Sequence, residues 1–193
     1  YQINHSTNVD NAMQYFTVND LKDLWDDSSY SQENYEEPIP TDEVIAAVEA
    51  ALGGYKLPAS YIELMRLKNG FSFQRDFFKL ANDDDFADAC IWVSDIMGIG
   101  FEKRYALCGE IGSQFMIEEW GYPEIGICFA STPSAGHEMY MLDYRECGKS
   151  GIPKVVHVDQ EGDYEITPIA DTFEDFIKGL VIEEEAFEDS LDK

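Results

Sequence analysis

The sequence predicts an α+β domain whose sheet is largely antiparallel and is packed on one side by helices. Short β-rich runs occupy the middle of the chain, and helical patterns stand before and after them. Strands and helices do not alternate regularly, as they would in the βαβ units of a parallel sheet. The 193 residues are 45% hydrophobic and 27% charged, which suits one folded domain rather than a disordered chain.

Two helices are predicted before the strands. Thr41 is a good N-cap, and the apolar residues after it repeat on one helical face until the pair Gly53-Gly54 ends the pattern. A second helix begins at Leu57-Pro58, because proline is tolerated in the first turn, where its missing N–H has no intrahelical partner. The pattern of this second helix ends at Asn69-Gly70.

Seven brief β-rich runs, separated by turn residues, are predicted to be strands. They are Phe71–Phe73, Phe77–Leu80, Cys90–Val93, Ile125–Ala130, Glu138–Tyr144, Val155–Gln160 and Tyr164–Thr167. The interval from Gly109 to Glu119 fits either a helix face or an irregular strand. Thr172 then caps a last helix, with Asp175 three residues later as the second member of a short-armed capping box.

The acidic excess is largest towards the two ends of the chain, with a net charge of −7 in residues 1–40 and −10 in residues 151–193. Thirteen Lys and Arg stand against 39 Asp and Glu, a formal net charge of −26. We expect residues 1–40 to form an acidic arm, either amphipathic or loosely docked, residues 41–182 to form the domain, and residues 183–193 to form an acidic tail. Acidic ends gathered on one face would repel nucleic acid and membranes and attract a basic partner, whereas evenly spread charge serves solubility alone.

The sequence also predicts the compartment. No apolar run is long enough for a membrane span, and the first residues lack the basic and apolar regions of a signal peptide. Cys90, Cys108, Cys128 and Cys147 are spaced by 18, 20 and 19 residues and form no C-x-x-C pair. This spacing favours reduced, buried thiols over a zinc site or disulfides, so we expect a cytoplasmic protein.

One group of side chains would suit a catalytic or metal site: His137, Asp143, His157 and Asp159. His157 and Asp159 point to the same face of a predicted strand, and a metal site there would need a third ligand from a neighbouring strand. A metal-dependent hydrolase would use His137, His157 and Asp159. The other interpretation is a hydrogen-bonded histidine on a half-buried strand. The sequence has no G-x-S-x-G elbow, phosphate-binding glycine loop or cysteine with a basic neighbour, so we predict no enzymatic activity and no cofactor.

The run Trp120-Gly121-Tyr122-Pro123 is the strongest binding feature of the sequence. It places two large aromatic side chains in a turn next to a glycine and a proline. Such rings are enriched at the centres of protein interfaces, but they are equally suited to packing in a core.

Several segments together resemble one family. They are LPASYIELMRLKNG, EEWGYPEIGICFA, STPSAGHEMYMLDYR, CGKSGIPKVVHVDQEGDY and ITPIADTFEDFIKGL. Over roughly residues 40–182 the chain is similar to the SUKH superfamily, which includes yeast cell-wall-synthesis regulators and many bacterial toxin-immunity proteins. The bacterial members that it most resembles carry Gly-Glu-Pro where this chain has Gly151-Ile152-Pro153.

The resemblance implies a non-enzymatic α+β protein with a curved, largely antiparallel sheet. It also implies binding to a cognate toxin domain, with a basic nuclease as the expected target and no direct contact with nucleic acid. The alternative is an intracellular regulatory scaffold related to the cell-wall-synthesis regulators. The candidate partner-binding residues are Glu118, Glu119, Trp120, Tyr122, His137, Glu138, Asp143, Tyr144, Asp159, Glu161 and Asp163.

Overall fold

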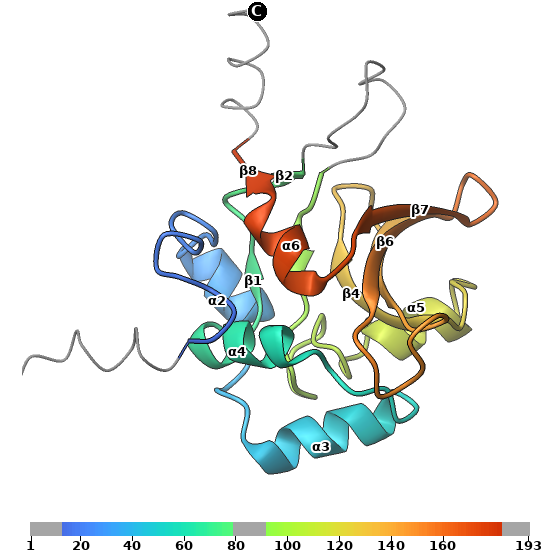
Figure 1. Ribbon diagram of the computed structural model, residues 1–193, viewed down its shortest axis with the longest axis horizontal. Coiled ribbons are helices and arrows are strands. Elements are labelled where there is room, and N and C mark those ends of the chain that lie inside the picture. The colour runs from blue at the N-terminus through green and yellow to red at the C-terminus, as the bar shows by residue number, and fades with distance from the viewer. Residues whose placement is uncertain (1–12, 79–91, 183–193) are drawn as a thin grey trace, which may run out of the picture.

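The computed structural model describes residues 13–78 and 92–182, and it confirms the α+β fold (Figure 1). The helices of the described residues are α2 (Ser29–Tyr35), α3 (Asp42–Ala51), α4 (Ala59–Leu67), α5 (Ser113–Glu118) and α6 (Phe173–Lys178). The strands are β1 (Phe71–Ser72), β2 (Phe77–Phe78), β3 (Asp95–Ile96), β4 (Gly126–Ser131), β5 (Glu138–Asp143), β6 (Lys154–Asp159), β7 (Glu165–Ala170) and β8 (Leu180–Val181).

A six-stranded antiparallel sheet in the order β1-β3-β4-β5-β6-β7 forms the centre of the molecule, and its curvature is visible along β6 (Figure 1). The edge strand β7 contains Pro168, and its pairing with β6 shifts register between Val155 and Val156. Such shifts bend a strand locally. β2 and β8 form a separate two-stranded sheet beside the main one.

Helices lie against both faces of the sheet, although the sequence pattern predicted only one. Neighbouring residues of a strand point to opposite faces. On β5, the ring of Tyr140 lies 5.1 Å from that of Phe176 on α6. The next side chain back, Met139, instead lines a cavity with Phe115 and Met116 of α5. The β5 side chains are therefore covered by α6 on one face and by α5 on the other.

The predicted N-caps Thr41 and Thr172 are confirmed. Thr41 Oγ1 accepts a hydrogen bond from the backbone N–H of Val44 at 3.2 Å, which caps α3. Thr172 Oγ1 accepts from the N–H of Asp175 at 3.2 Å in the same way and caps α6. Pro58 precedes the first residue of α4 without a side-chain cap. Side-chain capping therefore marks where α3 and α6 start, whereas α4 starts after Pro58 without such a cap.

Other parts of the chain differ from the sequence expectation. The ambiguous interval Gly109–Glu119 contains the short helix α5. Of the run Cys90–Val93, Trp92 forms only an isolated bridge to Phe77, and Cys90 lies outside the described residues. The strands β3 and β8 and the helix α2 were not predicted. The first twelve residues and the acidic tail 183–193 also lie outside the described part.

Residues 13–40 pack closely on the rest of the chain. Phe16 and Leu24 are buried in the main hydrophobic core. The carboxylate of Glu37 is buried and accepts hydrogen bonds from the backbone N–H groups of Glu102 and Lys103 at 2.8 and 2.7 Å. Since a buried charge is tolerated only with such partners, these bonds fix Glu37 against the loop that follows β3.

Candidate functional site

The structure divides the candidate partner-binding residues between the two ends of β5. Glu138 begins this strand and pairs with Asp159, whereas Asp143 ends it and pairs with Lys154. Trp120 lies at the Glu138 end, because its ring is 5.4 Å from that of His137. Nine of the candidates therefore belong to this end: Glu118, Glu119, Trp120, Tyr122, His137, Glu138, Asp159, Glu161 and Asp163.

Three candidates do not present free surface side chains. Tyr122 is only 2% exposed, and its hydroxyl donates to the carbonyl of Gly136 at 2.6 Å. Tyr144 is 3% exposed and donates to the carbonyl of Lys56. Asp143 is mostly buried and paired with Arg145 at 2.8 Å. The two tyrosines are core residues with satisfied hydroxyls, and the aspartate belongs to a local ion pair.

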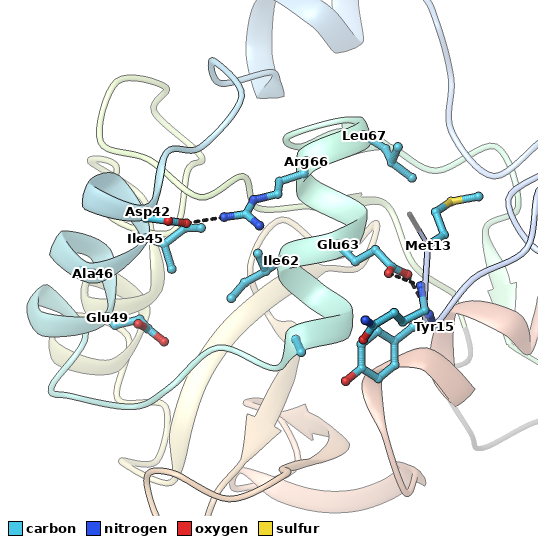
Figure 2. A pocket seen from close by; sticks show the side chains of 12 residues that line it. Met13, Tyr15, Asp42, Ile45, Ala46, Glu49, Ile62, Glu63, Arg66 and Leu67 are labelled. Carbon is cyan, nitrogen blue, oxygen red and sulfur yellow. Dashed lines mark hydrogen bonds and ion pairs between the residues drawn. The ribbon is translucent and has the colours of Figure 1, made fainter. Parts of the chain in front are cut away.

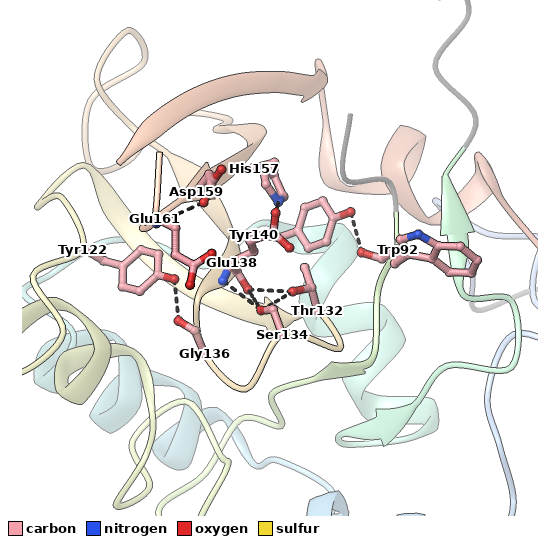
Figure 3. Close-up of polar contacts among 10 residues, drawn as sticks. All are labelled: Trp92, Tyr122, Thr132, Ser134, Gly136, Glu138, Tyr140, His157, Asp159 and Glu161. Carbon is pink, nitrogen blue, oxygen red and sulfur yellow. Dashed lines mark hydrogen bonds and ion pairs between the residues drawn. The ribbon is translucent and has the colours of Figure 1, made fainter. Parts of the chain in front are cut away.

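Hydrogen bonds from Ser134, Thr132 and Tyr122 fasten the loop between β4 and β5 (Figure 3), and His137 lies at the end of this loop. Ser134 Oγ accepts from the N–H of Glu138 at 2.9 Å, and Thr132 Oγ1 donates to the Glu138 carbonyl at 3.0 Å. The Tyr122 hydroxyl fastens the same loop at Gly136. His137 Nδ1 then lies 2.9 Å from Gln160 Oε1 and 3.6 Å from Glu161 Oε1. Side chains from the β4–β5 and β6–β7 turns thus meet at one place.

Carboxylates lie at this end of the sheet, on β5, β6 and β7, in the β6–β7 turn and at the C-terminal end of α5. We name this set the acidic rim: Glu118, Glu119, Glu138, Asp159, Glu161, Asp163 and Glu165. Glu138 pairs in register with Asp159, and Asp159 pairs with Glu165 of β7. Like charges directly opposite each other on neighbouring strands destabilise a sheet, so this row is costly for folding alone.

The segments that build the acidic rim contain no compensating Lys or Arg. Residues 105–144 and 155–177 have neither residue type. Glu165 was missed as a candidate because its position beside Asp159 depends on the register of β7. The register of β7 could be predicted only from an alternation of buried and exposed residues along the strand, and most residues of β7 are half-buried.

His157 is a buried neighbour of the rim. It is 6% exposed, packs its ring 5.4 Å from that of Tyr140, and places Nε2 3.8 Å from Glu138 Oε1 (Figure 3). Burial lowers the pKa of His157, and the nearby Glu138 and Asp159 carboxylates partly oppose that effect. The imidazole is therefore neutral at pH 7.

The described residues offer little for catalysis. Within residues 13–78 and 92–182, no three His, Cys, Asp or Glu side chains are grouped so as to hold a metal ion. Burial raises the pKa of the Cys108 thiol to about 11 and also raises the pKa of Cys128. A thiol with a raised pKa is a poor nucleophile at pH 7. Within the part described, His137, His157 and Asp159 are therefore not grouped as the metal-hydrolase interpretation requires.

A cavity of about 510 Å³ opens beside the rim, between α5, the β4–β5 loop and the tyrosines Tyr35 and Tyr105. We name it the Asp95 cavity. Its lining is Tyr35, Ser94, Asp95, Met97, Tyr105, Ile111, Phe115, Met116, Trp120, Ser131, Thr132, Pro133, Ala135, Gly136 and Met139. Trp120 and the β4–β5 loop belong to both the rim region and the cavity wall.

A second hollow, of about 720 Å³, lies between α3 and α4 (Figure 2). Its polar groups are engaged within the protein. The carboxylate of Glu63 accepts hydrogen bonds from the backbone N–H groups of residues 14–16, and Arg66 forms an ion pair with Asp42. These contacts attach residues 14–16 to α4, which gives the charged groups of this hollow a structural role.

The fold and the site define a class: an α+β domain with an acidic, aromatic-flanked sheet end and no catalytic set among the described residues. The sequence model of the SMI1 / KNR4 family (SUKH-1) matches residues 39–179. The chain therefore belongs to this family, whose members include toxin immunity proteins and SMI1/KNR4 regulators and act through protein–protein interaction. A comparison with curated proteins finds no match. No helix in the described residues combines the length and apolar character of a membrane span.

Proposed function

We propose that this protein is an immunity protein that binds and neutralises a cognate toxin domain, a basic nuclease, in the cytoplasm of the cell that makes it. The observation that carries the proposal is the acidic rim. Carboxylates on three neighbouring strands stand in register, in segments that hold no Lys or Arg. A surface that destabilises the free protein and attracts cations is expected where a cationic partner binds.

The chemistry of the proposed partner follows from the same charge. A nuclease domain carries Lys and Arg to hold the phosphate backbone of its substrate. An acidic protein that covers those residues competes directly with nucleic acid, and long-range attraction accelerates its association. Trp120 stands beside the rim and supplies a large ring of the kind found at interface centres.

The direct test is calorimetry of the full chain against the toxin domain encoded by the neighbouring reading frame, together with inhibition of its nuclease activity. We expect stoichiometric binding that weakens as salt rises from 0.05 to ~0.5 M, because salt screens exposed charges. Binding that is insensitive to salt would refute the electrostatic part, and absence of both binding and inhibition would refute the proposal.

A matched pair of variants locates the surface. Glu161→Gln/Asp163→Asn removes two exposed charges of the rim, and Glu43→Gln/Asp171→Asn removes two exposed charges elsewhere. A charge about 7 Å from a cation in water contributes roughly 0.6 kcal/mol, so the rim variant should weaken binding about tenfold. The control should change it less than about twofold. Equal losses in the two variants would mean that the rim is not the interface.

The regulatory alternative rests on the family itself, which includes the SMI1/KNR4 regulators. It predicts several intracellular partners and a gene without a toxin beside it. An adjacent toxin gene favours immunity, whereas an isolated locus and a failure to inhibit any neighbouring gene product favour the scaffold.

A further inference from the structure

The Asp95 cavity holds a buried carboxylate. Asp95 is 7% exposed and lines the cavity, and Ser131 Oγ donates to its Oδ1 at 2.6 Å. The hydroxyls of Ser94 and Tyr35 also favour the ionised form. None of these groups carries a positive charge, and no Lys, Arg or His forms an ion pair with Asp95 in the part of the chain described here.

Burial therefore acts on this carboxylate without charge compensation. It raises the pKa of Asp95, even though the three hydroxyls oppose the shift. Core packing alone does not require an acid at this position, since an amide has the same shape and could still accept from Ser131. The arrangement is explained if a cation enters the cavity and lies against Asp95.

The cavity walls favour a flat cation. Phe115, Trp120 and Tyr105 contribute rings, and the ring of Tyr105 already lies under the guanidinium of the protein's own Arg104, with 5.9 Å from Cζ to the ring centroid. A guanidinium stacks on aromatic faces, is weakly hydrated and donates two parallel hydrogen bonds to a carboxylate. An ammonium lacks the planar face, and a metal ion would find one carboxylate only.

We propose that the Asp95 cavity receives an arginine side chain of the protein partner. This inference rests on the proposed function and specifies one anchor of that interface, because the cavity shares Trp120 and the β4–β5 loop with the rim region. The rim attracts the basic surface, and the cavity holds one side chain from it. Buried anchors of this kind commonly dominate the binding energy of an interface.

The test uses N-acetyl-arginine amide as the probe and nuclear magnetic resonance of the full chain as the readout. The Trp120 indole and the Ser131 amide signals should shift with saturable, millimolar-range affinity. N-acetyl-citrulline amide, which has nearly the same shape without the charge, should bind at least ~10-fold more weakly. N-acetyl-lysine amide should also bind more weakly than the arginine probe. Equal binding of citrulline or lysine, or no shift at the cavity residues, would overturn the inference.

Two variants separate this inference from the proposed function. Asp95→Asn should lose at least ~10-fold in probe affinity, and its folding is checked by the unchanged signals of the rest of the protein. The rim variant Glu161→Gln/Asp163→Asn should bind the probe within about twofold of the original chain while binding the toxin domain less tightly. If the toxin domain binds and the probe does not, the arginine anchor is wrong and the immunity function stands. If the probe binds and the toxin domain does not, the immunity function is wrong and the cavity is still an arginine-binding site.

Discussion

Asn69 is the residue whose replacement tests most directly how the N-terminal segment is joined to the sheet. It follows α4, it is fully buried, and its side chain makes three hydrogen bonds. Nδ2 donates to the carbonyls of Pro38 at 2.7 Å and Ile99 at 3.0 Å, and Oδ1 accepts from the N–H of Ile99 at 2.7 Å. One amide therefore connects the segment before α3 to the loop after β3.

The expected effect of Asn69→Ala follows from these contacts. Each buried hydrogen bond contributes about 1 kcal/mol net, and losing a partner leaves a buried backbone group unsatisfied at a similar or larger cost. The void left by the shortened side chain adds to this. We expect the free energy of unfolding to fall by about 3–4 kcal/mol. Asn69→Asp should be at least as damaging at pH 7, because a carboxylate would face two carbonyl oxygens.

Urea unfolding followed by circular dichroism and tryptophan fluorescence measures this loss. The control is Asn34→Ala, which removes one exposed hydrogen bond, from Asn34 Nδ2 to the carbonyl of Tyr30, and should cost less than about 0.5 kcal/mol. The m-value should stay unchanged, so that only the midpoint moves. A loss at Asn69 no larger than that at Asn34 would refute the structural role assigned to this amide.

Three further predictions concern the site. The folded-state pKa of His157 lies below its unfolded value of 6.5, so the unfolded chain binds this proton first as the pH falls. The free energy of unfolding should therefore decrease below pH 6.5 and level off below the folded pKa, and His157→Gln should flatten this slope in thermal melts from pH 7.5 to 5. The pKa of Asp95 is raised in the folded state, so its ionised carboxylate destabilises the fold at pH 7. Asp95→Asn should therefore raise the melting temperature at pH 7 and lose that advantage as the pH falls to 3.8. An unchanged or lower melting temperature of the variant at pH 7 would contradict the charge argument. Gly121→Ala introduces a methyl group at φ +77°, 2.7 Å from Tyr164 Oη, and should cost about 2 kcal/mol and shift the Trp120 indole resonance, an effect that a tolerant turn would not show.

The parts of the fold that the sequence predicted are those with local chemistry. The side chains of Thr41 and Thr172 each accept a hydrogen bond from a backbone N–H three residues later, so a local pattern predicts these helix starts. The strands β4 to β6 are predicted by runs rich in β-branched and apolar residues. By contrast, β3 has only two residues, and its place between β1 and β4 is a long-range property. No local rule marks a strand that exists only because its neighbours pair with it.

The candidate site was predictable in composition and not in arrangement. The run Trp120–Pro123 suits a surface or a core equally, and the structure uses Trp120 beside the rim and buries Tyr122. The sequence does not show that Asp159 pairs with Glu165, because the register of β7 depends on the geometry of the turn before it. Nothing next to Asp95 in the sequence shows that this acid is buried, since the cavity that it lines is completed by distant residues such as Tyr35 and Phe115.

Pro168 has a consequence for how another molecule can attach to this one. An outer strand normally offers a row of amide donors that a foreign peptide can extend. On β7 Pro168 has no amide N–H to donate, and the register shifts between Pro168 and Ala170. Fibril-like stacking and recruitment by added strands are both discouraged along that border. Recognition along this edge therefore depends mainly on side chains, and these can change by point substitution while the backbone stays the same.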